Sequence, residues 1–176
     1  MNTLQVNSPD AVTRKAASLI QRYHTRNPWK LADELNITVQ EHPFKRQKGI
    51  YTIIKRNRYI FLKEDLDPVT KDLVLLHEIG HDQLHRRYAS QKPFSELQLF
   101  SLNSDRLEYE ANLFAAQLSL PEDELLEYVY RGYDDVQIAR AMHSDSNLVA
   151  MRVAALCRQK DYAFRIPEHK TNVFKD

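Results

Sequence analysis

The sequence predicts an α+β fold in which a small mixed sheet packs on one long helix and further helices follow. Apolar residues recur at helical spacing through most of the chain, whereas the alternating and β-branched runs typical of strands are confined to residues 37–62. Strands that stand together in the chain, with helices before and after them, are typical of this class. A chain of 176 residues can also bury one core without disulfide bonds.

Two helices and three strands are expected before residue 63. Ser8-Pro9-Asp10 indicates a helix start, and the residues after it place one apolar stripe along a helix: Val12, Ala16, Leu19, Ile20 and Tyr23. Asn27-Pro28 begins a short second helix. Residues 37–42 alternate as a strand does, and two further runs, 50–54 and 59–62, flank a short polar stretch that suits a hairpin turn. The sheet therefore has at least three strands.

Helices dominate the rest of the chain. The pattern predicts a long helix from Pro68 to about His85, then a long loop over 86–104 that could cover a cleft. Asp105 is a candidate N-cap for a helix to about Leu120, and shorter helices are expected at 121–131, 136–142 and 148–157. We expect a domain at 1–130, a helical extension packed on it at 131–160, and a poorly ordered tail at 161–176.

Composition narrows the functional class. The 25 basic and 24 acidic residues nearly cancel, so no overall charge attracts nucleic acid or an anionic membrane. Cys157 is the only cysteine and lies in an apolar run, which favours a buried thiol in a reducing compartment. The N-terminus lacks the pattern of a signal peptide, and the apolar runs are too short to span a bilayer. We expect a cytoplasmic protein.

The segment that carries chemistry is the H-E-x-x-H motif of His77, Glu78 and His81 within the long helix. Positions four residues apart are neighbours on a helix, so both imidazoles can reach one metal ion. Glu78 then lies beside the metal, where its carboxylate can take a proton from activated water and later deliver it to a leaving amine. The pattern could also arise by chance, with the histidines as ordinary core residues. Gly80 makes a chance match less plausible. Glycine lowers the stability of a helix interior, and its presence there is explained if another backbone approaches closely.

A catalytic zinc ion needs a third protein ligand, and the candidate lies in EYEANLFAAQLSLP. Glu108 falls within the apolar stripe of that helix, so its carboxylate would face the core, where a zinc ion could be its partner. Glu110 lies about 100° away from the stripe and is the reserve candidate. Glu108 could instead be a salt-bridged helix residue. Asn112 could hydrogen-bond a metal-binding histidine.

HEIGHDQLH followed by EYEANLFAAQLSLP resembles the ImmA/IrrE family of metallopeptidases, in which an HExGHxxLH helix precedes an ExEAxxFAxxLLMP-like helix. The resemblance is strongest over residues 70–126, and it departs from the pattern at Ser119-Leu120. It implies a zincin-like fold, Zn2+ held by His77, His81 and Glu108, and Glu78 as general base. It also implies a typical substrate, a helix-turn-helix repressor cut at a limited site. His85 matches the pattern too, but it lies about 80° from the His77 face and is assigned to packing or support of a ligand.

Other interpretations remain open. The protein could be a non-hydrolytic regulator that binds a repressor or antitoxin, or a zinc hydrolase acting on a non-peptide bond. Residues 136–157 resemble a helix-turn-helix, but the second helix is so apolar that burial is favoured over DNA binding. A substrate peptide could pair with an exposed edge strand of the hairpin. A structure with both hairpin strands paired on each side would count against that pairing.

Overall fold

The computed structural model describes residues 7–89, 94–96, 100–102, 105–160 and 166. The elements follow in the order α1 (Pro9–Tyr23), α2 (Pro28–Glu34), β1 (Thr38–His42), β2 (Gly49–Ile54), β3 (Asn57–Lys63), α3 (Pro68–Ala89), β4 (Phe94–Glu96), α4 (Arg106–Ser119), α5 (Glu122–Tyr130), α6 (Asp135–Ala141) and α7 (Ser146–Lys160). The predicted α+β class is confirmed. Apart from Ile166, the predicted tail lies outside the described residues.

The sheet is mixed, with strand order β1-β3-β2-β4. β1 runs parallel to β3, while β2 is antiparallel to both β3 and β4. The predicted hairpin is confirmed, and Lys55 and Arg56 form its two-residue turn with φ of 49° and 69°. Such positive φ values at both turn residues match the right-handed twist of paired strands.

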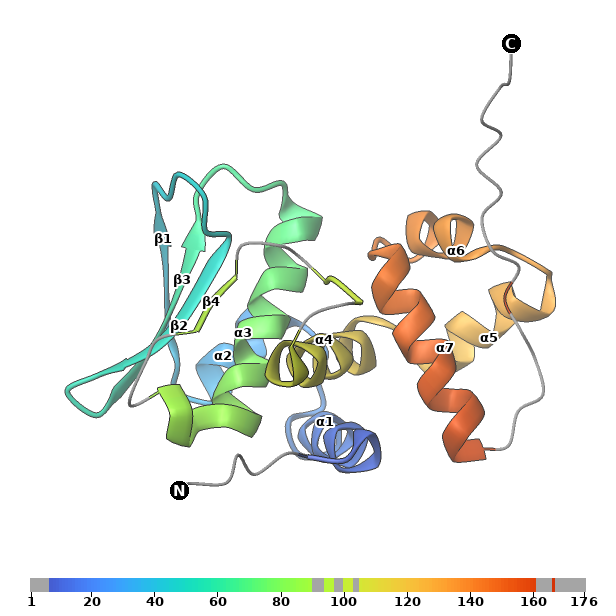
Figure 1. Ribbon diagram of the computed structural model, residues 1–176, viewed down its shortest axis with the longest axis horizontal. Helices are drawn as coiled ribbons and strands as arrows, with labels where there is room; N and C mark the ends of the chain where they lie inside the picture. The colour runs from blue at the N-terminus through green and yellow to red at the C-terminus, as the bar shows by residue number, and fades with distance from the viewer. Residues whose placement is uncertain (1–6, 90–93, 97–99, 103–104, 161–165, 167–176) are drawn as a thin grey trace, which may run out of the picture.

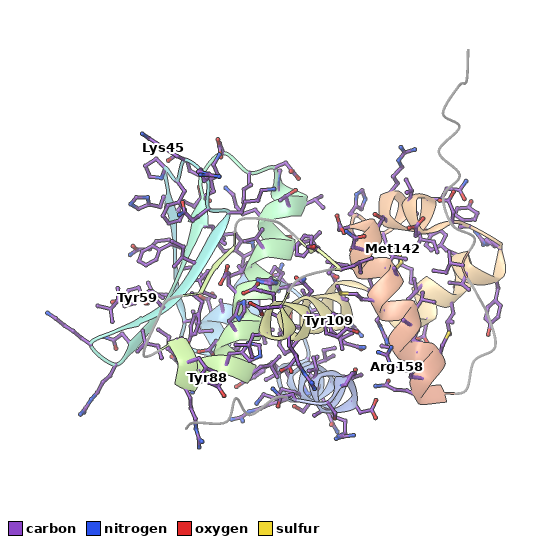
Figure 2. The ribbon with its side chains drawn as sticks, in the orientation of Figure 1. Lys45, Tyr59, Tyr88, Tyr109, Met142 and Arg158 are labelled. Carbon is purple, nitrogen blue, oxygen red and sulfur yellow. The ribbon has the colours of Figure 1, made fainter. Side chains whose placement is uncertain are left out.

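One face of the sheet packs on α3. Ile60 and Leu62 of β3 are buried toward the core, whereas Tyr59 and Phe61 alternate to the other side, where their rings stack with centroids 6.0 Å apart. Figure 2 shows Tyr59 on the side of the sheet that faces away from α3. The alternation explains why β3 is apolar along both faces but fully buried on only one.

The helix α4 lies at the centre of the helical part. It contacts α3, α1 and α7, and every residue from 110 to 118 is buried. In Figure 1, α4 crosses α3 on the side opposite the sheet, with α1 below it and α7 beyond it. Asp105 caps α4 as predicted, because its side chain accepts hydrogen bonds from the backbone N–H groups of Leu107 and Glu108.

The predicted loop over 86–104 is wrong at its start and in its middle. α3 continues through a non-helical residue, His85, to Ala89, and residues 94–96 form β4. β4 pairs with β2 over Gly49 to Tyr51, so β2 has neighbours on both sides there, as β3 does along its length. This pairing counts against a substrate peptide bound to an edge of the hairpin. The remaining loop residues, except 100–102, lie outside the described part of the chain.

The segment that resembles a helix-turn-helix packs into the core. α7 contacts α4 and α6, and its apolar residues are buried: Leu148, Val149, Met151, Val153, Ala155 and Leu156. Arg152 is only 5% exposed, and its Nε donates to the Leu120 carbonyl. Burial of this helix is therefore confirmed. Among the described residues, no helix is both long and apolar enough to cross a membrane.

Candidate metal centre

The buried middle of α3 presents the H-E-x-x-H residues. His77, Glu78 and His81 are at most 1% exposed. Because His77 and His81 are one helical turn apart, their rings lie side by side, and their Nε2 atoms are 3.0 Å apart. The structure therefore aims two ring nitrogens at one point, as the spacing predicts.

α4 brings Glu108 to the same point. Its Oε2 lies 3.1 Å from Nε2 of His77, and its Oε1 lies 3.4 Å from Nε2 of His81. The ligand atoms of His77, His81 and Glu108 all lie within 4.8 Å of one another. Ligands at about 2.0–2.2 Å from a tetrahedral zinc ion lie about 3.3–3.6 Å from one another, so these separations are close to what such an ion needs. The Glu108 side chain is 22% exposed as a whole, although its Oε2 atom, which faces His77, is buried.

Charge states at the cluster suit metal binding. Burial lowers the pKa of His81 to about 3, although Glu108 opposes the shift, so His81 is neutral near pH 7. Burial alone would raise the pKa of Glu108, but interactions with His77 and His81 outweigh it and hold that pKa well below its usual value. Neutral imidazole and ionised carboxylate are the forms that ligate metals.

Gly80 allows the two helices to meet closely. A Cβ atom at Gly80 would lie 3.2 Å from both Cα of Ala111 and Cδ1 of Phe114. This close approach confirms the prediction made from the cost of a mid-helix glycine, and it is what brings Glu108 within reach of the α3 histidines.

Asn112 and His85 contact the two candidate ligand histidines at Nδ1, the ring nitrogen that does not face the cluster. Oδ1 of Asn112 lies 2.8 Å from Nδ1 of His77, which is the predicted support of a metal-site histidine. Nδ1 of His85 lies 3.0 Å from Nδ1 of His81, so His85 also contacts a candidate ligand without joining the cluster. Burial, partly opposed by Glu110, lowers the pKa of His85.

The structure does not bring the reserve candidate Glu110 to the cluster. Its Oε2 lies 3.1 Å from Nε2 of His85, and the residue is 2% exposed. The stripe argument expected Glu108 to be the more buried of the two. It fails here because α4 is covered on several sides, so a residue off the stripe is buried as well.

Two neighbours of the site were missed from the sequence. Gly49, at the start of β2, is so close to Glu78 that a Cβ atom there would lie 2.4 Å from Oε1. Phe100 is 2% exposed and packs edge-on against His77, with ring centroids 6.3 Å apart. A glycine in a strand signals close backbone approach and could have drawn attention to Gly49. Phe100 lies in a segment without periodicity and gives no comparable signal.

The comparisons with known proteins concern the same part of the chain. Residues 32–154 match the IrrE N-terminal-like domain, a peptidase family. Uncharacterized immunity region protein 2 of Bacillus phage phi105 is 34% identical over 148 residues, which cover 81% of this chain and 91% of that protein. Metallopeptidase ImmA of Bacillus subtilis (strain 168) is 22% identical over 174 residues, which cover 97% and 99%. The family match spans the sheet, α3 and α4, and so contains the whole His-His-Glu cluster.

Proposed function

Because the chain belongs to the IrrE N-terminal-like family of metallopeptidase domains, we propose that it is a zinc-dependent endopeptidase that cuts a helix-turn-helix repressor at a limited site. The observation that carries the proposal is the convergence of His77, His81 and Glu108 beside a buried Glu78. The proposal includes a zincin-like fold, and the meeting of the α3 motif with the α4 carboxylate supports it.

Zinc is the metal that best suits the cluster. Two imidazoles and one carboxylate form a typical catalytic zinc set, which leaves a fourth position for water. The same donors also hold Fe(II) in oxygenases. Glu78, a buried carboxylate next to His77 in the chain, favours hydrolysis, because hydrolysis needs a group that moves a proton.

Glu78 has the position of the proton carrier. His77, His81 and Glu108 would hold the zinc ion, which would activate water and polarise the substrate carbonyl. The water oxygen then adds to the carbonyl carbon while its proton passes to the Glu78 carboxylate. Glu78 returns that proton to the peptide nitrogen as the C–N bond breaks, which releases an amine and a carboxylic acid.

The substrate class rests on the family. One relative is named Metallopeptidase ImmA, and the other is named for the immunity region of a phage. A repressor of a mobile element or stress regulon fits both names. Such a target is a DNA-binding protein, so we place the activity in the cytoplasm, where the lone Cys157 would stay reduced.

The test uses the zinc-loaded protein and the repressor encoded beside it. Wild type, Glu78→Gln and a control, Glu124→Gln in the exposed first turn of α5, are incubated with the repressor and followed by intact mass. Zinc content is measured for each protein. We expect two defined fragments from wild type and the control, and none from Glu78→Gln at equal zinc content.

Other results would contradict the proposal. Equal fragments from wild type and Glu78→Gln would remove Glu78 from its role. Tight repressor binding without fragments from any protein would favour a non-hydrolytic regulator instead. Iron rather than zinc in the purified protein would overturn the metal assignment.

A further inference from the structure

A row of buried polar groups leads away from the candidate metal centre. Nδ1 of His81 lies 3.0 Å from Nδ1 of His85, and Nε2 of His85 lies 3.1 Å from Oε2 of Glu110. All three residues are at most 2% exposed. Buried polar groups are costly unless each donor meets an acceptor, so the protons along this row must be arranged consistently.

The outer end of the row is an ionised carboxylate. Asn7 donates to both oxygens of Glu110, through its backbone N–H to Oε1 at 3.0 Å and through Nδ2 to Oε2 at 2.8 Å. The Arg106 guanidinium adds a positive charge, with Nε 3.5 Å from Oε1. Both carboxylate oxygens of Glu110 therefore meet donors from outside the row, and Oε2 also faces His85. An ionised carboxylate can only accept, so Nε2 of His85 carries the proton in that contact.

The proton on Nε2 of His85 determines the proton positions of the next groups in the row, toward the candidate metal centre. A neutral imidazole carries one N–H, so Nδ1 of His85 presents a lone pair and accepts from Nδ1–H of His81. His81 is thereby left with a lone pair on Nε2, the atom that faces His77 and Glu108. Asn112 does the same for His77 by accepting from its Nδ1–H through Oδ1.

We propose that Glu110, acting through His85, fixes the tautomer of His81 and so presents its Nε2 lone pair to the metal ion. The inference rests on the metal site of the proposed function. It makes His85 and Glu110 positioning residues. It also gives Asn7 a role, because Asn7 donates to both oxygens of Glu110 from outside α4.

The first measurement is made on zinc-loaded protein labelled with 15N-histidine. Long-range proton–nitrogen spectra distinguish the two tautomers of each ring. We expect His85 to be protonated on Nε2, with its Nδ1 accepting from His81. A wild-type His85 protonated on Nδ1 would overturn the proposal, whatever the variants do.

A matched pair of variants separates tautomer control from packing. In His85→Gln, the amide can accept from His81 and donate to Glu110, so zinc affinity by chelator competition should stay within about threefold of wild type. In His85→Phe, the ring volume is kept but the acceptor is lost, and zinc affinity should fall by about 10–100-fold. His143→Gln, at an exposed histidine, serves as the control.

A role in packing alone predicts the opposite order, with Phe tolerated better than Gln. Equal affinities for His85→Phe and wild type would also overturn the proposal. If His85→Phe does not fold, the wild-type spectrum and the Gln variant still decide. Zinc affinity and tautomers are measured without substrate, so a chain that shows the expected row but cuts no repressor would refute the proposed function alone.

Discussion

Gly49 and Glu78 lie so close together that a side chain at position 49 would meet the carboxylate. A Cβ atom there would lie 2.4 Å from Oε1 of Glu78 and 2.7 Å from Cγ1 of Val74. The backbone at the start of β2 therefore packs directly against the proposed base. Only glycine, which has no Cβ atom, leaves room for the Glu78 carboxylate there.

Gly49→Ala should separate catalysis from metal binding. The added methyl group displaces the Glu78 carboxylate, so we expect proteolysis to fall by about 100-fold or more, as small misplacements of catalytic groups do. None of the metal ligands is touched, so zinc affinity should change less than threefold. Ser18→Ala, at an exposed position of α1, is the control. Full activity in Gly49→Ala would show that Glu78 tolerates displacement and is not the base.

Asn112 offers a test of the support behind His77. Asn112→Leu removes the acceptor that lies 2.8 Å from Nδ1, so zinc affinity should fall by about 10–100-fold. Asn112→Asp keeps an acceptor there and should retain affinity. Both are measured by chelator competition, with unfolding curves of the metal-free proteins to follow stability. A Leu variant that binds zinc like wild type would show that Asn112 contributes only packing.

The metal-free protein should lose stability in mild acid. The pKa of His81 is lowered by burial to about 3, whereas an unfolded histidine titrates near 6.5. As pH falls through 6.5, His81 becomes protonated in the unfolded chain but stays neutral in the folded chain. Protonation therefore stabilises the unfolded state, and the free energy of unfolding decreases. From pH 7 to pH 5 this one group should cost about 2 kcal/mol, and His85, whose pKa is also lowered, acts in the same direction.

Urea unfolding of the metal-free protein at pH 7 and pH 5 checks this expectation. Wild type is compared with His81→Gln, which cannot titrate at that position. The variant should lose less stability between the two pH values than wild type does. Equal losses in both proteins would mean that His81 does not remain neutral in the folded state.

Local geometry explains which parts of the site could be predicted. The spacing of His77 and His81 fixes their relation through the helical repeat alone, and Glu108 and Asn112 are likewise one turn apart on α4. Gly80 was informative because glycine destabilises the interior of a helix. Its presence there therefore implied a close contact with another part of the fold. These inferences needed only one helix at a time, so the sequence was sufficient for them.

Features that depend on several elements were not predictable in the same way. The burial of Glu110 depends on Asn7 and His85, which are far from it in the chain. The three residues of β4 carry little signal of their own and obtain their register by pairing with β2. Gly49 meets Glu78 only because the sheet packs on α3, a contact that no local pattern specifies.

The last prediction concerns the contact that holds the sheet against α3. Asp82, next to His81, accepts a hydrogen bond from Tyr51 Oη at 2.7 Å and is paired with Arg58 at 3.0 Å. Burial and the hydrogen bond to Asp82 together raise the pKa of Tyr51 well above its usual value, so the hydroxyl remains a donor. Tyr51→Phe leaves a buried carboxylate oxygen short of one donor, which should lower the free energy of unfolding by about 1–3 kcal/mol.

Zinc affinity shows whether the contact between Tyr51 and Asp82 supports the metal ligands or only the proposed base. The ligands come from α3 and α4 and not from the sheet, so Tyr51→Phe should bind zinc as wild type does while proteolysis falls, because β2 also carries Gly49 beside Glu78. Tyr130→Phe, at a tyrosine that is 69% exposed, is the control. Urea unfolding, chelator competition and cleavage are measured on all three proteins. A parallel loss of zinc affinity in Tyr51→Phe would mean that the sheet supports the metal ligands themselves and not only the base.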